Sequence, residues 1–171
     1  MHIQIDGISY EASGDNTLLT VLRRFGDLRS DSAPVLPLVR ALLDVEPETR
    51  VLRDPTRGGL ATALYEIAAA SRVGILLEEA KVPVRPEVYA ACELLGFDPL
   101  YVACEGRFLA IVPAQAADRA LAALRALPTG ADSQCIGEVT SGEPGRVLLR
   151  TRIGSHRRIE RLSGEQLPRI C

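Results

Sequence analysis

Hydrophobic residues recur along this chain at two spacings, which predict helices in some segments and strands in others. A spacing of three and four residues is typical of a helix with one buried face. It occurs in Leu36–Leu43, where Pro47 should end the helix, and in Leu60–Ala68. It also predicts helices over Arg85–Leu95 and Gln115–Leu127.

Short apolar or alternating runs predict the strands. They are expected at residues 50–53, 74–78, 101–104, 107–112, 134–139 and 146–153, with an edge strand at 157–162. Several neighbouring runs are joined by short turns and favour hairpins, for example 101–104 with 107–112 around Glu105-Gly106. We therefore expect an α+β fold, with a mixed sheet covered by helices rather than a doubly wound parallel sheet.

The first 28 residues stand apart from this pattern. His2–Ile5 and Ile8–Glu11 flank Asp6-Gly7, which is a hairpin signal, and a short apolar run follows at 18–22. We expect an extra segment of open role over 1–28, one domain over 29–162 and a mobile tail over 163–171.

Charge and composition exclude several classes of function. Lys and Arg number 20 against 22 Asp and Glu, and only 4% of residues are aromatic. That balance argues against a general binder of nucleic acids or anionic membranes. No apolar run approaches the roughly 20 residues of a membrane helix. The N-terminus shows no secretory signal, so we expect a cytoplasmic protein.

The four cysteines do not form a metal-binding pattern. Cys92, Cys104, Cys135 and Cys171 are widely spaced, with no C-x-x-C motif and no Cys/His pair at zinc spacing. No intrinsic metal site is therefore predicted. The first three lie in apolar helix-like or strand-like runs and are expected to be buried, inert thiols.

The segment Asp54-Pro55-Thr56-Arg57-Gly58-Gly59 is the first candidate site. Two glycines at a helix start leave backbone N–H groups uncovered, and the helix dipole favours an anion there. Thr56 can cap the helix and Arg57 can add charge, so a phosphate group could dock. The plainer alternative is that Asp54 or Thr56 caps the helix, while the glycines permit close packing against the sheet.

Glu105 and the C-terminal tail are the other candidates. Glu105, at a tight bend, is either a general base or an ordinary solvated turn carboxylate. The tail Pro168-Arg169-Ile170-Cys171 ends in a thiol. On a mobile arm stiffened by Pro168, a thiol can be loaded in one place and used in another, whereas the alternative is a frayed end.

Arginines gather toward the same end of the chain. They are Arg146, Arg150, Arg152, Arg157, Arg158, Arg161 and Arg169. They either attract anionic, phosphate-bearing partners or form an ordinary solvated edge strand.

Four stretches occur in the order expected of one family: Asp54–Ala61, Leu95–Tyr101, Glu105-Gly106 and Gly164–Cys171. With them the chain, from about Leu28 to Cys171, resembles the C-terminal half of the HypE carbamoyl dehydratases of hydrogenase maturation. The resemblance implies the C-terminal α/β sandwich of the PurM-like, AIR synthase-related architecture.

The resemblance also implies a reaction. Cys171 would accept a carbamoyl group from a HypF-like carbamoyltransferase, and ATP, with magnesium, would phosphorylate the carboxamide oxygen. Glu105 would be the acid/base residue, and loss of phosphate would leave a thiocyanate on sulfur. The cyano group would then pass to iron on a HypC–HypD-like scaffold for [NiFe]-hydrogenase.

The sequence departs from that family in three ways. Cys104 stands where the family usually has Asn, and Arg107 stands where Lys is common. The family's N-terminal domain, with most of the ATP and magnesium site, has no counterpart in residues 1–28. We therefore expect a carrier that is incomplete alone and needs a separate ATP-binding half.

Two alternatives remain open. The chain is otherwise a non-catalytic module that binds the maturation partners, or a PurM-like domain whose tail thiol handles redox chemistry or metal. The sequence leaves homo-oligomerisation open.

Overall fold

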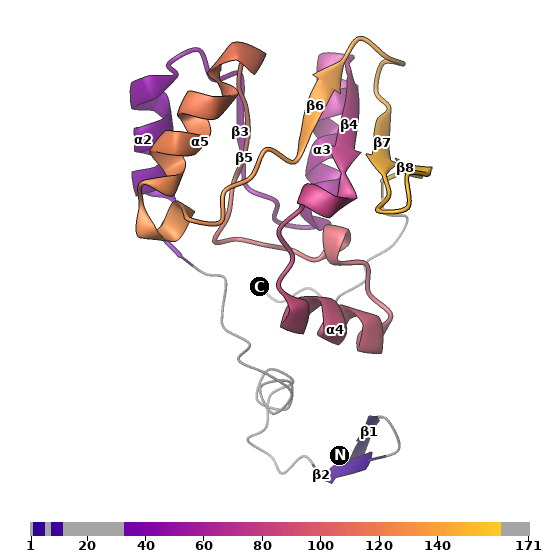
Figure 1. The fold of residues 1–171 in the computed structure, drawn as a ribbon. Helices are drawn as coiled ribbons and strands as arrows, with labels where there is room; N and C mark the ends of the chain where they lie inside the picture. Colours follow the sequence, from indigo (N-terminus) through magenta and orange to yellow (C-terminus); the bar gives the residue numbers. More distant parts are fainter. Residues whose placement is uncertain (1, 6–7, 12–32, 162–171) are drawn as a thin grey trace. The chain divides into compact units, whose positions relative to one another are not determined.

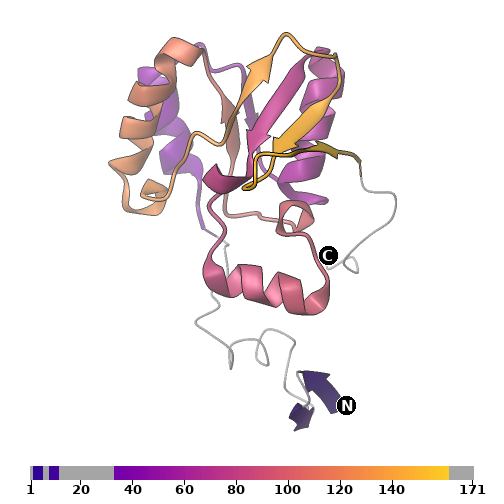
Figure 2. The same cartoon turned by 45° about the vertical axis from the view of Figure 1, so that its right-hand side comes forward.

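The computed structural model describes residues 2–5, 8–11 and 33–161. The chain divides into two compact units, one of residues 1–30 and 84–99 and the other of residues 31–83 and 100–171. Figures 1 and 2 show the elements from two directions. Short 3-10 turns lie at Glu79–Lys81, Pro99–Tyr101, Ala114–Ala116 and Pro128–Gly130.

The described residues of the first unit form two paired strands and one helix. β1 (His2–Ile5) and β2 (Ile8–Glu11) pair antiparallel, as the intervening Asp-Gly predicts. α4 (Pro86–Leu95) begins at a proline and ends at Gly96, whose φ of 70° is left-handed. Proline at the start and glycine just past the end are the usual helix boundaries, and the predicted helix is confirmed.

The larger sheet of the second unit has four strands in the order β6-β4-β7-β8. β4 (Gly74–Glu78) lies parallel to β7 (Val147–Arg150) and antiparallel to β6 (Gly137–Thr140). β8 (His156–Ile159) pairs antiparallel with β7 at the edge, where the sequence predicts an edge strand.

One helix covers one face of this sheet. α3 (Gly59–Ser71) lies along the sheet in both ribbon views. Its small and apolar residues face alternate residues of the strands, because side chains of a strand alternate between faces. The buried core consists of Ala61, Leu64, Ala68, Ile75, Leu77, Leu100, Val147, Leu149 and Ile159.

A second core lies between two helices and a two-stranded sheet. α2 (Leu36–Val45) and α5 (Ala117–Arg125) run side by side, and β3 (Val51–Arg53) pairs antiparallel with β5 (Leu109–Ile111). The residues Leu38, Leu42, Ala120 and Leu124 form this core, with Phe108, Ala110, Val112 and Leu127 against it. Leu109 packs against the α3 core instead, so β5 contributes to both cores.

An ion pair between a buried carboxylate and a half-exposed arginine joins the two helices of this layer. Glu46, directly after α2, is 2% exposed and pairs with Arg119 of α5. Its carboxylate also accepts the N–H of Glu48 at 3.1 Å. A buried carboxylate needs such partners, since desolvation of an unpaired charge is costly.

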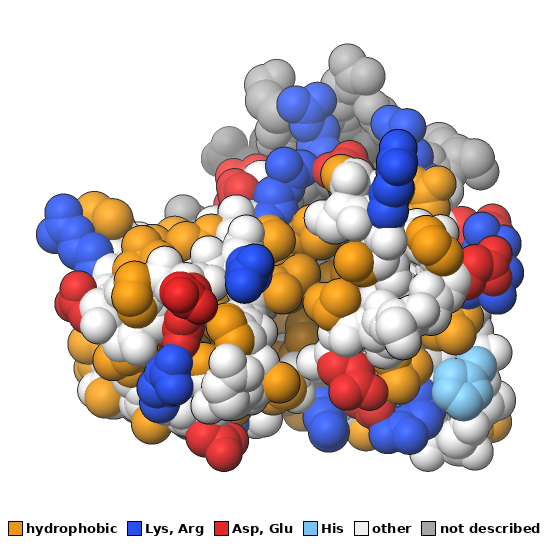
Figure 3. Space-filling model, turned by 90° about the horizontal axis from the view of Figure 1, so that it is seen from above, with side chains coloured by type: hydrophobic (Ala, Val, Ile, Leu, Met, Phe, Trp, Pro, Cys, Tyr) orange, Lys and Arg blue, Asp and Glu red, His pale blue; other side chains and the backbone are white. Residues whose placement is uncertain are grey.

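Figure 3 shows one face of the second unit from above, hollowed at its middle, with hydrophobic side chains in the hollow and charged ones around it.

The mixed sheet with covering helices confirms the predicted fold class. Two predicted hairpins are wrong. Residues 101–104 form no strand, and β5 pairs with β3 instead. The 3-10 turn Pro99–Tyr101 overlaps the start of that run, and the Cys104 N–H donates to the Pro55 carbonyl in a loop rather than to a neighbouring strand. β6 and β7, which follow one another in the sequence, do not pair because β4 lies between them in the sheet.

The predicted apolar run at 18–22 and the predicted tail at 163–171 lie outside the described residues. Within the described ranges, no helix has the length and apolar character needed to span a bilayer.

Candidate functional site

The segment Asp54–Gly59 carries the chain from β3 into α3. The N-cap residue of α3 is Gly58, with φ 76°, and Gly59 follows with φ 61°. The Gly59 N–H donates to the Thr56 carbonyl at 2.9 Å, which closes the turn. No side chain caps the helix. The predicted cap by Asp54 or Thr56 is therefore wrong, because a left-handed Gly58 turns the chain before either side chain reaches the helix.

Gly59 makes the closest backbone approach in this region. A Cβ placed on it would stand 2.6 Å from the carbonyl oxygens of both Leu100 and Val102. No side chain fits in that space, and the left-handed φ independently favours glycine. The glycine therefore permits close packing, as one interpretation predicts, although it packs against the 3-10 turn rather than the sheet.

A backbone hydrogen bond joins the Glu105 turn to the Asp54–Gly59 segment. The Cys104 N–H donates to the Pro55 carbonyl at 2.8 Å, which fixes the Cys104–Gly106 turn against the Asp54–Gly59 segment. Pro55 is buried at this contact, while Arg57 and Glu105 are exposed on the turns beside it. Two stretches about fifty positions apart in the sequence thus form one surface, with an arginine and a carboxylate at its rim.

The described chain ends beside this surface. The Tyr101 hydroxyl donates to the Glu160 carbonyl at 3.0 Å, so the end of β8 is held to the turn that contacts Gly59. Arg161 is the last described residue, and the tail residues Pro168, Arg169, Ile170 and Cys171 lie outside the described ranges. The end of β8 is therefore tied to the turn that leads into the Glu105 stretch.

Several of the C-terminal arginines form ion pairs. Arg150 pairs with Glu78 at 2.5 Å, and Arg146 pairs with Glu143 at 2.6 Å. Arg158 lies 3.7 Å from Glu160. These pairs partly neutralise the basic end, in keeping with an ordinary edge strand.

Sequence reasoning missed two polar side chains at the site. Thr62, one turn into α3, lies against Gly58, and its buried Oγ1 finds no hydrogen-bond partner among the described residues. Tyr101 is the other, through its bond to Glu160. For Thr62, the sequence offers one signal, which is its position one turn after the Gly58-Gly59 pair. Nothing local in the sequence reveals the second, because its partner is a distant backbone carbonyl.

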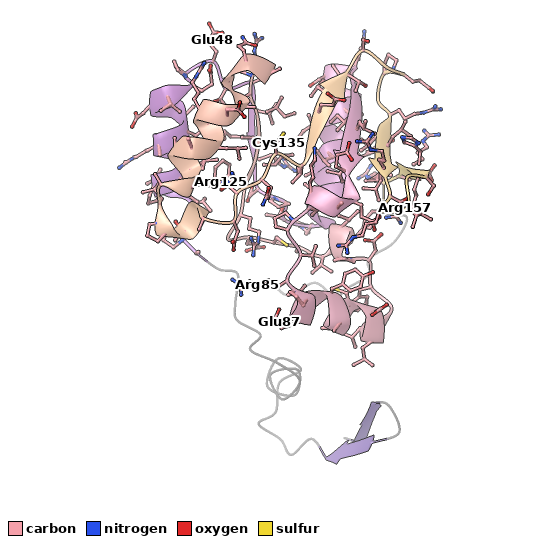
Figure 4. All side chains as sticks on the ribbon, viewed as in Figure 1. Glu48, Arg85, Glu87, Arg125, Cys135 and Arg157 are labelled. Carbon is pink, nitrogen blue, oxygen red and sulfur yellow. The ribbon has the colours of Figure 1, made fainter. Side chains whose placement is uncertain are left out.

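The three described cysteines differ in exposure. Cys92 is buried, and burial raises the pKa of its thiol, with the Asp98 carboxylate adding to the effect. Cys104 is half-buried, and its Sγ lies 3.5 Å from the Val102 carbonyl. Cys135 is exposed on the segment between α5 and β6, near Arg125 (Figure 4). The prediction of three buried thiols is therefore right for Cys92 and wrong for Cys135, because β6 begins only at Gly137.

The described residues offer no metal centre. Over 2–5, 8–11 and 33–161, no three His, Cys, Asp or Glu side chains gather at a distance that could hold an ion.

Comparison with known proteins identifies the family of this domain. Residues 5–150 match the family described as AIR synthase related protein, C-terminal domain. The chain belongs to this family. It is 56% identical over 145 residues to the carbamoyl dehydratase HypE of Cupriavidus necator, covering 85% of this chain and 41% of that protein.

Solved structures agree with the assignment to AIR synthase related C-terminal domains. A crystal structure of the hydrogenase maturation protein HypE in complex with ATP matches with a TM-score of 0.80 at 43% identity, over 89% of this chain and 48% of that one. A HypE–HypF complex matches with a TM-score of 0.75 at 37% identity, over 84% and 48%. The chain thus spans less than half the length of these relatives.

Proposed function

We propose that this chain is the carrier part of a carbamoyl dehydratase for hydrogenase maturation, with Cys171 as the residue that holds the carbamoyl group. The observation that carries the proposal is the joined surface of Asp54–Gly59 and Cys104–Gly106 beside the departure point of the tail. The identities to HypE proteins support it. Similarity to a HypE that has been crystallised with HypF supports a HypF-like carbamoyltransferase as the donor of the carbamoyl group.

Chain length permits Cys171 to visit this surface. Ten residues follow Arg161, so the tail can extend over at most about 33–36 Å. Its departure point is separated from Cys104 by one tyrosine side chain and three residues of backbone. A terminal thiol on such an arm can leave to be loaded by a partner and then return.

Within this proposal each part has one task. The thiolate of Cys171 attacks the carbamoyl carbon of the donor on the carbamoyltransferase, the bond from that carbon to the donor's leaving group breaks, the leaving group takes the electron pair, and the sulfur then carries a thiocarboxamide. Glu105 accepts a proton from the carboxamide nitrogen once the oxygen has been phosphorylated. Arg57 and the Gly58-Gly59 helix start face the phosphate. The nitrogen also loses its second proton, the carbon–oxygen bond breaks and inorganic phosphate leaves, so that the sulfur carries a thiocyanate whose cyano group passes to iron on a HypC–HypD-like scaffold.

ATP, with its magnesium, supplies the phosphoryl group. The matching HypE–ATP structure supports nucleotide use by the family, but less than half of that protein's length corresponds to this chain. The proposal therefore assigns most of the nucleotide site to a further ATP-binding half, in the same polypeptide or in a separate one. It places the reaction in the cytoplasm.

Intact-mass measurement tests the proposal. The reduced chain is incubated with carbamoyl phosphate, ATP and a HypF-type carbamoyltransferase, and the adduct is mapped by peptide sequencing. We expect one carbamoyl adduct on Cys171, absent in Cys171→Ala and unchanged in the exposed control Cys135→Ser. An unmodified Cys171 after conditions that load a full-length HypE would refute the carrier role.

The addition of an ATP-binding half separates the carrier from the complete reaction. We expect the adduct to lose water only when that half is present, and Glu105→Gln to retain the adduct while slowing the loss of water at least 100-fold. Loss of water at the wild-type rate in Glu105→Gln would remove Glu105 as the base.

A further inference from the structure

We propose that the turn between β7 and β8 is a docking site for the carbamoyltransferase, and that Ile153 at its tip enters an apolar pocket with an acidic rim on that enzyme. The inference rests on the proposed function in one respect, namely that a carbamoyltransferase loads this chain. The exposure, the rigidity and the charge of residues 150–158 support the assignment.

Ile153 has the largest exposed fraction among the described large hydrophobic side chains. It is 91% exposed, whereas Leu36 at the start of α2 follows with 55%. Exposure alone does not indicate a docking site, because single apolar residues are common at protein surfaces. The further observation is the ordered turn that presents this side chain.

Hydrogen bonds within the turn fix the backbone around Ile153. The Gly154 N–H donates to the Thr151 carbonyl at 2.9 Å, and the Thr151 N–H donates to the Ser155 carbonyl at 2.8 Å. The hydroxyl oxygens of Thr151 and Ser155 lie 2.7 Å apart and share a hydrogen bond. The turn is therefore closed by both its backbone and its side chains.

Two consecutive carboxylates at the end of β4 hold the base of the turn. The Arg152 N–H donates to the Glu79 carboxylate at 2.9 Å. Arg150 pairs with both carboxylate oxygens of Glu78, at 2.8 and 2.5 Å. A turn that is ordered before binding loses little conformational freedom when a partner covers it, so that more of the contact energy appears as affinity.

The flanks of the turn are basic. Residues 143–161 contain six arginines and two glutamates, and Glu78 and Glu79 add two carboxylates, so cations remain in excess. Arg157 lies on β8 at the edge of the sheet, on the side away from α2 and α5 (Figure 4). An apolar anchor within a charged rim is typical of an interface hot spot, and the complementary partner surface carries carboxylates.

The place of the turn in the chain favours the carbamoyltransferase as the occupant. β8 is four residues long, or about 13 Å, and Glu160 and Arg161 follow it. An enzyme that takes up the chain beyond Arg161 therefore lies within reach of the turn. A bilayer is a poorer occupant, because even a whole acyl chain gives only marginal membrane binding and the turn offers a single apolar side chain.

Binding kinetics with a HypF-type carbamoyltransferase as the probe test the inference on the full chain. We expect Ile153→Ala to weaken binding at least roughly ten-fold, mainly through faster dissociation, and to leave the urea midpoint unchanged because the side chain is exposed. The matched control Leu36→Ala, at another exposed hydrophobic residue, should bind as the wild type does. Equal weakening in both variants, wild-type binding by Ile153→Ala, or no binding by the wild type would overturn the inference.

The acidic rim is tested by charge reversal. We expect Arg158→Glu to slow association at least roughly five-fold at low salt, with the difference shrinking as the salt concentration rises. Arg40→Glu makes the same change of net charge on the exposed side of α2 and should associate at the wild-type rate. Equal slowing by the two reversals would show unspecific attraction and refute a rim matched to this turn.

Cys171→Ala separates this inference from the proposed function. It removes the proposed carrier thiol and should keep the same dependence of binding on Ile153. A carbamoyl adduct on Cys171 together with wild-type binding by Ile153→Ala refutes only the docking site, whereas Ile153-dependent binding without any adduct refutes only the carrier role. An effect of Ile153→Ala confined to phosphatidylserine vesicles or to the ATP-binding half would also refute the docking site, because the turn would then have another occupant.

Discussion

Replacing Gly59 by alanine tests the central contact of the site. The residue has φ 61°, and an added Cβ would stand 2.6 Å from two carbonyl oxygens. Left-handed backbone costs an L-residue roughly 1–2 kcal/mol. Overpacking adds about 1–3 kcal/mol. We therefore expect Gly59→Ala to lower the free energy of unfolding by about 2–5 kcal/mol.

Gly154 supplies the matched control in the same compact unit. Its φ is 84°, but a Cβ there would have nothing within 4 Å. Gly154→Ala thus incurs the backbone cost without the collision. Any stabilisation through a stiffer unfolded chain is shared by both variants and cancels in the difference.

Urea unfolding measures that difference. For a slope of about 2 kcal/mol per molar urea, the midpoint of Gly59→Ala should fall below that of Gly154→Ala by about 0.5–1.5 M, with the slope unchanged. Equal midpoints for the two variants would refute the close approach of Gly59 to the Leu100–Val102 turn. The proposed joining of the two candidate stretches would then lose its structural basis.

Three further predictions concern the ion pair, the tail anchor and the buried thiol. Arg119→Leu strands the buried Glu46 carboxylate and should lower the free energy of unfolding by about 2–4 kcal/mol, whereas Arg53→Leu, at an exposed pair, should cost under about 1 kcal/mol in the same urea assay. Tyr101→Phe removes the bond to the end of β8; we expect a loss of about 0.5–1.5 kcal/mol and faster amide exchange in β8, and wild-type exchange would contradict the anchor. The pKa of the Cys92 thiol is raised in the folded state, so its contribution to the free energy of unfolding is complete below the pKa of the unfolded chain and is lost as pH rises. The free energy of unfolding should therefore fall above about pH 9.0, and it should fall less in Cys92→Ala.

The sequence predicted most elements of the fold because their signals are local. Helical spacing and end signals located α4 between Pro86 and Gly96, and a run of apolar residues located β4 at Gly74–Glu78. The failure at 101–104 has a physical cause. Its residues suit a strand, but strand formation depends on a partner, and β3 rather than this run supplies the partner of β5.

Exposure was harder to predict than secondary structure. Cys135 lies in an apolar run, yet β6 starts two residues later, so the thiol remains at the surface. Cys135 therefore lies in the segment before the paired strand, where no neighbouring strand holds the side chain against the core. The burial of Cys92 was predicted correctly because a helical face tolerates such small boundary errors.

The site itself depends on backbone contacts, and these leave little trace in a sequence. Gly59 indicates a close approach but does not say to which segment, and the Cys104–Pro55 bond uses no side-chain polar group at all. In the proposed function, a substitution of the exposed Arg57 is expected to change the chemistry, whereas a side chain at Gly59 would displace the turn that carries Cys104 and Glu105 together. The architecture and the chemistry can thus be perturbed separately, which allows the carrier role to be tested on a folded chain.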